Sequence, residues 1–114
     1  MKAIKINTNV NLSSGITLPS GAIVVIAEGY TDVKNQKDGF IPSQIATLLF
    51  ASLEALQSGK VSINDVADYT PVFSGLQLSV VDYSTKTAEQ LLVDTVEAEL
   101  ISVYGAENIE EVEL

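Results

Sequence analysis

The sequence predicts an α+β fold, in which an antiparallel sheet or open barrel is covered by one long C-terminal helix. Three observations support this fold class. Apolar and polar residues alternate in short runs of the first two-thirds of the chain, as in strands with one face in water. The run Ala22–Ala27 is wholly apolar and rich in β-branched residues, which is typical of a central strand. Apolar residues then recur at helical spacing before Gly105. The length suits one domain, residues 1–114, with one core.

The first strand is predicted at Lys2–Asn7. Ile4 and Ile6 alternate there with polar neighbours, which suits an edge strand with one wet face. Glycine-containing turns follow at 13–15 and 19–21, where glycine supplies the positive φ of a chain reversal. These signals predict a meander that leads into the central strand.

The central strand Ala22–Ala27 is predicted to end at Glu28 and Gly29, and Tyr30–Val33 to form a short further strand. The polar segment 34–39 has no residue that would pack in a core, so it is predicted to be an exposed loop.

Residues 41–59 allow two interpretations. Pro42, a series of leucines and Gly59 suit one helix through the whole segment. The alternative is a strand at Gln44–Phe50 followed by a short helix that begins after Ser52 as its N-cap. We favour the second interpretation, because alternate residues of the strand would share one face and the sheet needs partners.

The next segments are predicted to be irregular and then β. Val61–Pro71 is mixed in character and lacks a clear period. Val72–Val81 alternates, with Leu76, Leu78 and Val80 on one face, and is predicted as a strand.

The C-terminal helix is predicted from about Thr85 to Tyr104, with Gly105 as its stop. One apolar stripe should face the sheet: Leu92, Val93, Val96, Leu100, Val103 and Tyr104. A second sector is mostly small: Ala88, Leu91, Thr95, Ala98 and Ser102. This sector either receives another molecule or faces a loop of the same chain. The acidic tail that follows the helix either adds an edge strand or stays solvated.

The composition argues against an enzyme. The chain has no histidine, cysteine or tryptophan, so it lacks the usual group that titrates near neutral pH, the usual soft metal ligand and the best nucleophile at this pH. We therefore expect no catalytic residue, no cofactor site and no metal site. A calcium loop at Asp32, Asn35 and Asp38 has the wrong spacing for an EF-hand and contains two lysines.

The charge pattern bears on the partners. The net charge is −9 and all six basic residues are lysines, so neither nucleic acid nor an anionic membrane surface is an expected partner. The longest apolar run is far too short to span a bilayer. Only 18% of the residues are charged, against about 25% in a typical soluble domain, which favours apolar surface that a neighbouring subunit covers.

Three segments together resemble the small virion proteins that build necks, tail rings or head attachments in tailed bacteriophages of gut bacteria. They are SGITLPSGAIVVIAEGYTDVKNQKDG, SLEALQSGK and the helix TAEQLLVDTVEAEL. The resemblance implies a structural subunit present in many copies, with itself and other virion proteins as partners. It also implies location in the virion, after assembly in the host cytoplasm. The expected function is a subunit of a symmetric oligomer, in a ring or connector.

The contact between copies is predicted on two elements. The first is the small sector of the helix, at Ala88, Leu91, Thr95 and Ala98. The second is the predicted edge strand, at Lys2, Ile4 and Ile6, which would pair with a neighbour's edge. Two alternatives remain: an acidic accessory or inhibitor protein that binds one basic partner through Glu107–Leu114, and a small sugar- or calcium-binding module at Tyr30–Gly39.

Overall fold

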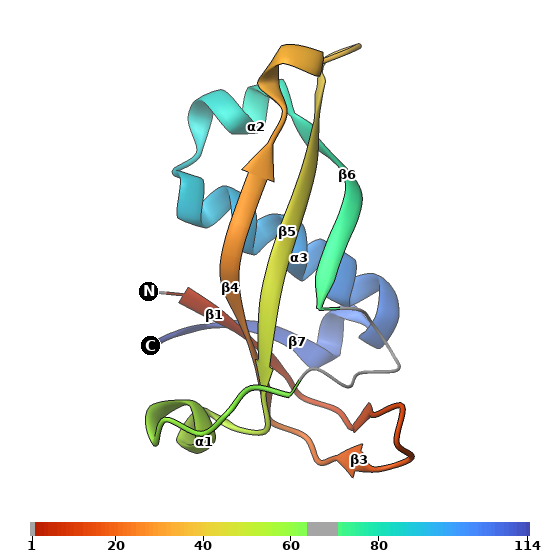
Figure 1. Cartoon of the computed structure of the whole chain (residues 1–114), viewed down its shortest axis with the longest axis vertical. Helices are drawn as coiled ribbons and strands as arrows, with labels where there is room; N and C mark the ends of the chain where they lie inside the picture. Colours follow the sequence, from red (N-terminus) through yellow and green to blue (C-terminus); the bar gives the residue numbers. More distant parts are fainter. Residues whose placement is uncertain (1, 64–70) are drawn as a thin grey trace.

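The computed structural model describes residues 2–63 and 71–114 of the chain (Figure 1). Most of the segment predicted to be irregular therefore lies outside the described residues. The elements are β1 (Lys2–Ile6), β2 (Val10–Asn11), β3 (Thr17–Leu18), β4 (Ala22–Thr31), η1 (Val33–Asn35), β5 (Phe40–Phe50), α1 (Leu53–Gln57), β6 (Val72–Ser79), α2 (Val80–Thr85), α3 (Ala88–Tyr104), η2 (Ala106–Asn108) and β7 (Ile109–Glu113).

The main sheet has five strands in the order β6-β5-β4-β1-β7, and every neighbouring pair is antiparallel. Helix α3 packs on this sheet, so the predicted α+β class is confirmed. The sheet also includes the acidic tail, which forms β7 and pairs with β1 along its whole length. This ladder explains why the tail forms a strand, since its backbone groups bond to those of β1.

The prediction that Lys2–Asn7 is an edge strand is wrong. Strand β1 lies between β4 and β7, and Ile4 pairs with Val24 on one side and with Glu111 on the other. Ile4 and Ile6 are fully buried in the main core. A strand with two neighbours has no unpaired backbone to offer another molecule. Lys2, Ile4 and Ile6 therefore do not form the predicted open edge.

Strand β4 continues four residues beyond its predicted end. Its first residues are buried on both faces, as expected for a central strand. The pairing with β5 shifts by one residue between Ile26 and Glu28, which marks a β-bulge at Ala27. Gly29 follows the bulge, and a Cβ atom there would lie 2.8 Å from both terminal methyl groups of Leu92 in α3. Glu28 and Gly29 thus mark a bulge and a close helix contact inside one strand.

Residues 41–59 follow the interpretation that we favoured. Strand β5 ends at Phe50, and the hydroxyl of Ser52 accepts a hydrogen bond from the Ala55 N–H at 3.0 Å to begin α1. Alternate residues of β5 are buried against α3, which accounts for the alternation: Ile41, Ser43, Ile45, Thr47 and Leu49.

Helix α3 begins at Ala88, three residues later than predicted, because residues 80–85 form the separate helix α2. The Thr87 hydroxyl caps the first turn by accepting from the Gln90 N–H, and Gly105, with φ of 91°, ends the helix. The core stripe is rotated relative to the prediction. Leu91 is buried against Ile41 and Leu78 of the sheet, whereas the predicted Val103 is 46% exposed.

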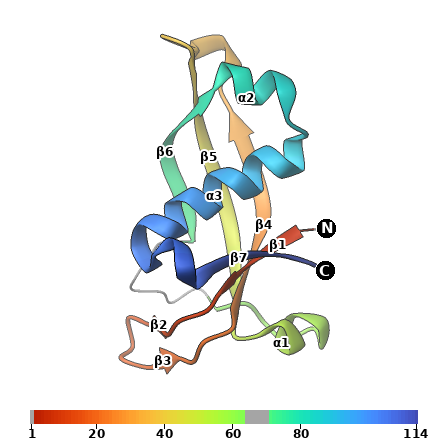
Figure 2. The same cartoon turned by 180° about the vertical axis from the view of Figure 1, so that it is seen from behind.

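The two faces of the sheet are covered unequally. Helix α3 lies behind the sheet in Figure 1 and in front of it in Figure 2. On the opposite face, α1 covers only the lower end, where Leu56 packs on Ile23, Val25 and Phe50. No helix of the described residues has the length and apolar character needed to cross a membrane.

Candidate functional site: an open sheet face and a groove beside strand β6

The part of strands β4, β5 and β6 that faces away from α3 and lies above α1 is called the open sheet face. Residues paired across antiparallel strands point to the same side. Tyr30 pairs with Gln44, Pro42 with Gln77, and Ala46 with both Glu28 and Val72. The side chains of this face are Glu28, Tyr30, Phe40, Pro42, Gln44, Ala46, Leu48, Val72 and Gln77.

The open sheet face is apolar and nearly free of charge. Tyr30 is 64% exposed, Phe40 46%, Val72 43% and Leu48 37%. Glu28 is the single carboxylate of the set, which includes no lysine or arginine. Large apolar side chains gathered on one face, rather than scattered singly, are typical of a surface that another molecule covers.

The sequence analysis did not identify this face. The sequence feature that could have indicated this face is in β5, which has apolar residues on both of its faces. Ile45 and Leu49 face α3, whereas Ala46, Leu48 and Phe50 face the opposite side of the sheet. A strand that is apolar on both sides requires cover on both sides. In the described residues that cover comes from α1 only at Phe50.

A groove lies between β6, α2 and α3, on the helix side of the sheet. Its volume is about 410 Å³, and its floor is formed by Leu76 and Leu78 of β6 and Leu91 of α3. The structure thus brings three of the predicted contact residues to one place, since Thr95 and Ala98 line the groove beside Leu91. Ala98 is exposed and Thr95 half-buried, but Leu91 is buried in the core and belongs to the floor.

The fourth predicted residue of the helix lies elsewhere. Ala88 is exposed and lines a separate hollow of about 380 Å³ with Gly29, Tyr83 and Leu92. The small sector of α3 is therefore divided between two depressions rather than forming one stripe.

Strand β6 is one edge of the sheet and borders the groove. The carbonyl of Pro42, its neighbour on β5, accepts a hydrogen bond from the Asp32 N–H at 2.9 Å and so points toward β4. Pro42 pairs with Gln77 in the register of β5 and β6. Pro42 and Gln77 are therefore a non-hydrogen-bonded pair, in which the backbone groups of each residue point away from the partner strand. The N–H and C=O of Gln77 thus point to the outer edge of the sheet.

The rim of the groove carries four charged residues, three of them acidic: Asp82, Lys86, Asp94 and Glu99. The Lys86 ammonium lies 2.8 Å from Asp94 Oδ2, so these two charges compensate each other. Neither Asp82 nor Glu99 forms an ion pair with any residue of 2–63 or 71–114. The rim is left with uncompensated negative charge.

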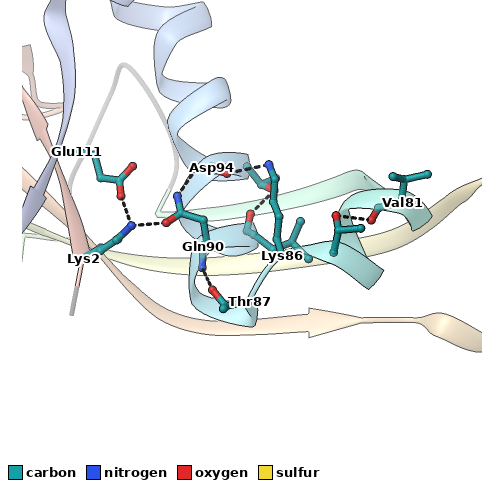
Figure 3. A network of polar contacts seen from close by, with 10 residues as sticks. Lys2, Val81, Lys86, Thr87, Gln90, Asp94 and Glu111 are labelled. Atoms are coloured by element: carbon teal, nitrogen blue, oxygen red, sulfur yellow. Dashed lines mark hydrogen bonds and ion pairs between the residues drawn. The ribbon is translucent and has the colours of Figure 1, made fainter.

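A polar network joins the groove to the first and last strands (Figure 3). The Lys2 ammonium donates to Glu111 at 2.8 Å and to the side-chain oxygen of Gln90. The Gln90 amide in turn donates to Asp94 Oδ1 at 2.6 Å, and Asp94 accepts from Lys86. The network therefore ties β1, β7 and α3 together next to the core.

Three carboxylates of this region lie close together. Oxygen atoms of Asp94, Glu97 and Glu111 all lie within 4.8 Å of one another. Two of them already have ammonium partners in Lys86 and Lys2. Burial and the negative charges of Glu111 and Asp94 raise the pKa of Glu97. Burial acts to raise the pKa of Asp94 as well, but the hydrogen bonds from Lys86 and Gln90 outweigh it and lower this pKa.

Asp94→Asn and Glu97→Gln are expected to change the stability in opposite directions at neutral pH. The folded state holds the Glu97 proton more tightly than the unfolded chain, so ionisation of Glu97 weakens the fold as the pH rises through the raised pKa. The lowered pKa of Asp94 has the reverse effect: its stabilisation is present above the ordinary pKa of aspartate and is lost as the pH falls through the lowered value.

The measurement is the urea midpoint of each variant at about pH 7 and about pH 3. At neutral pH Glu97→Gln should raise the midpoint and Asp94→Asn should lower it, the latter by about 0.5 kcal/mol in free energy of unfolding, as for other partly exposed ion pairs. The effect of Glu97→Gln should vanish at the acidic pH. Effects of one sign, or effects independent of pH, would contradict this assignment of the shifts.

The structure also describes the two segments to which the alternative functions were assigned, Tyr30–Gly39 and the acidic tail Glu107–Leu114. In the 30–39 region, the Asn35 amide donates to Asp32 Oδ2 at 2.6 Å, so these two side chains already bond to each other. In the acidic tail, Glu110 and Glu111 face Lys5 and Lys2 at 3.8 and 2.8 Å. Both segments use part of their polar groups within the fold.

Comparison with known proteins identifies no matching family model, no matching curated protein and no matching solved structure. The proposals below therefore rest on the geometry of the described residues and on the resemblance stated above.

Proposed function

We propose that this protein is a structural subunit that assembles with copies of itself into a symmetric oligomer. The observation that carries the proposal is the open sheet face, where exposed Tyr30, Phe40 and Leu48 lie over β4 and β5 and no described residue forms a second layer. Two such faces, or one face against another surface of a neighbour, would complete a two-layer arrangement on that side of the sheet.

The charge distribution supports a second copy as the occupant. With a net charge of −9, two copies repel each other unless their contact avoids the acidic residues. Those residues are concentrated on α3 and β7, whereas the open sheet face holds only Glu28. A contact through this face therefore brings few acidic groups of two copies together.

The place of the oligomer in a phage particle is proposed from the resemblance alone. On that basis the subunit belongs to a ring or connector of a tailed phage, is assembled in the host cytoplasm and contacts other virion proteins. A contact between a face and a different surface gives a ring if the rotation closes, whereas a contact between two identical faces gives a two-fold dimer.

Sedimentation equilibrium of the full chain tests the proposal. We expect a mass that is a whole-number multiple of 12.1 kDa and that holds over a wide range of protein concentration. A mass of twice 12.1 kDa indicates the two-fold contact, and a larger fixed multiple indicates a closed ring. A mass of 12.1 kDa up to about 1 mM protein would contradict self-assembly, because a contact of ordinary size, about 1,600 Å², forms well below that concentration.

A further inference from the structure

The outer edge of β6 and the groove beside it form a second surface, which adjoins the open sheet face at Phe40 and Gln77 and extends to the helix side of the sheet. We propose that this surface binds an extended segment of a partner protein, which adds a strand to β6 and places a lysine or arginine side chain in the groove. The inference does not depend on self-assembly, since it concerns the edge of the sheet and the helix side.

The first argument is the state of the β6 edge. Sheet edges are usually protected against pairing by charged residues, proline, bulges or a cover. Strand β6 has a bulge at Ser74 and Gly75, so the segment that can accept another strand is Leu76–Ser79. This segment includes no charge and no proline, and the backbone groups of Gln77 point outward. The opposite edge differs, because β7 carries Glu110, Glu111 and Glu113. One edge of this sheet is thus protected by charge and the other is not.

The second argument is the chemistry of the groove. In an added strand, alternate side chains point to the α3 side of the sheet and therefore into the groove. The floor formed by Leu76 and Leu78 suits the methylene stem of a long basic side chain. The carboxylates of Asp82 and Glu99 at the rim, which have no ion pair among the described residues, suit its charged end.

The same charges argue against this chain as the occupant. Its other edge, β7, would bring three glutamates to a rim that already carries Asp82 and Glu99. Like charges at a desolvated contact oppose binding. The surface therefore suits a basic segment from a different protein, with apolar residues on the side that faces away from the groove.

An NMR titration of the full chain with a synthetic peptide tests the inference. The probe is the acetylated and amidated hexapeptide Thr-Lys-Val-Arg-Val-Thr, whose lysine and arginine share one face of an extended chain. We expect amide shifts confined to β6, α2 and the groove side of α3, and slower exchange of the Gln77 amide with solvent. The acidic peptide Thr-Glu-Val-Glu-Val-Thr should cause no shifts.

Variants then assign the binding to the proposed groups. Gln77→Pro removes the outward N–H without removing a bond to β5, and should abolish binding of the basic peptide. Asp82→Asn with Glu99→Gln should weaken it about tenfold or more, since each charge-assisted hydrogen bond is worth about that factor. The matched control is Glu54→Gln with Glu107→Gln, which removes two exposed carboxylates elsewhere and should leave the affinity within about twofold.

Three results would overturn the inference. The first is equal shifts with the acidic peptide, and the second is shifts centred on β7 or α1. The third is a change in the oligomeric mass of the protein itself on Gln77→Pro, which would mean that the groove holds a second copy. The last result would leave self-assembly intact, so the failure of this inference is distinguishable from the failure of the proposed function.

Discussion

Val96→Asp is expected to leave the chain unfolded at neutral pH. Val96 is fully buried in the main core, in the middle of α3 and between α3 and the sheet. An aspartate there buries an unpaired charge, and residues 94 and 97 add further acidic groups nearby. We expect a loss of at least about 4 kcal/mol, a large part of the total stability of about 5–15 kcal/mol that is typical of a domain. Far-UV circular dichroism and urea titration measure it.

The matched control for this variant is Ala98→Glu, two residues further along the same helix. Ala98 is exposed at the groove, so its replacement introduces a charge without burying it. This variant should keep a cooperative urea transition close to that of the unsubstituted chain. If Val96→Asp unfolded with the same midpoint as Ala98→Glu, the position of the core stripe described above would be wrong.

Tyr30→Lys combined with Leu48→Lys is expected to yield a folded monomer. Both side chains lie on the open sheet face, and neither contributes to a core cluster of the described residues. Each substitution removes apolar area from the proposed contact and adds a charge that the contact would have to desolvate. A loss of about 1.5 kcal/mol or more at each site corresponds to a dissociation constant about a hundredfold higher. Sedimentation equilibrium gives the mass, and the urea midpoint confirms the fold.

The control for the open sheet face uses two exposed apolar residues in other places. Ile16 is 62% exposed in the β2–β3 hairpin and Val61 is 89% exposed after α1. Ile16→Lys with Val61→Lys adds the same two charges, and the mass should remain that of the oligomer. An oligomer that survives the first pair of substitutions and dissociates with the second would move the contact between copies away from β4 and β5.

The local parts of the fold follow from the sequence, because their causes are local. The alternation in Val72–Ser79 and in β5 reflects one face against α3. Ser52 caps α1 and Gly105 ends α3, as their residue types indicate. These elements could be predicted since each depends on a few neighbouring residues.

The parts that could not be predicted depend on distant contacts. Gly29 resembles a strand terminator, but it lies in β4 because Leu92 approaches too closely for a side chain. The acidic tail becomes a strand because β1 offers it both a ladder and the ammonium groups of Lys2 and Lys5. No residue near Glu110 in the sequence indicates that the tail pairs with β1.

The candidate site was predictable only in part. Thr95 and Ala98 were identified as a small sector, and the structure places both at the groove. The open sheet face could not be predicted, because the periodicity of a strand does not show how many layers of the protein cover the sheet. The apolar residues on both faces of β5 indicate a strand buried on both sides, and they do not show that residues 2–63 and 71–114 cover one face only in part.

The pairing of Lys2 with Glu113 also has a consequence for biosynthesis. Because these two residues are far apart in the sequence, β1 keeps one unpaired side until β7 has been synthesised. Closing so large a loop is slow compared with forming a hairpin. The ladder between β1 and β7 is therefore expected to form later than the hairpin ladders, and β1 depends until then on its other neighbour, β4.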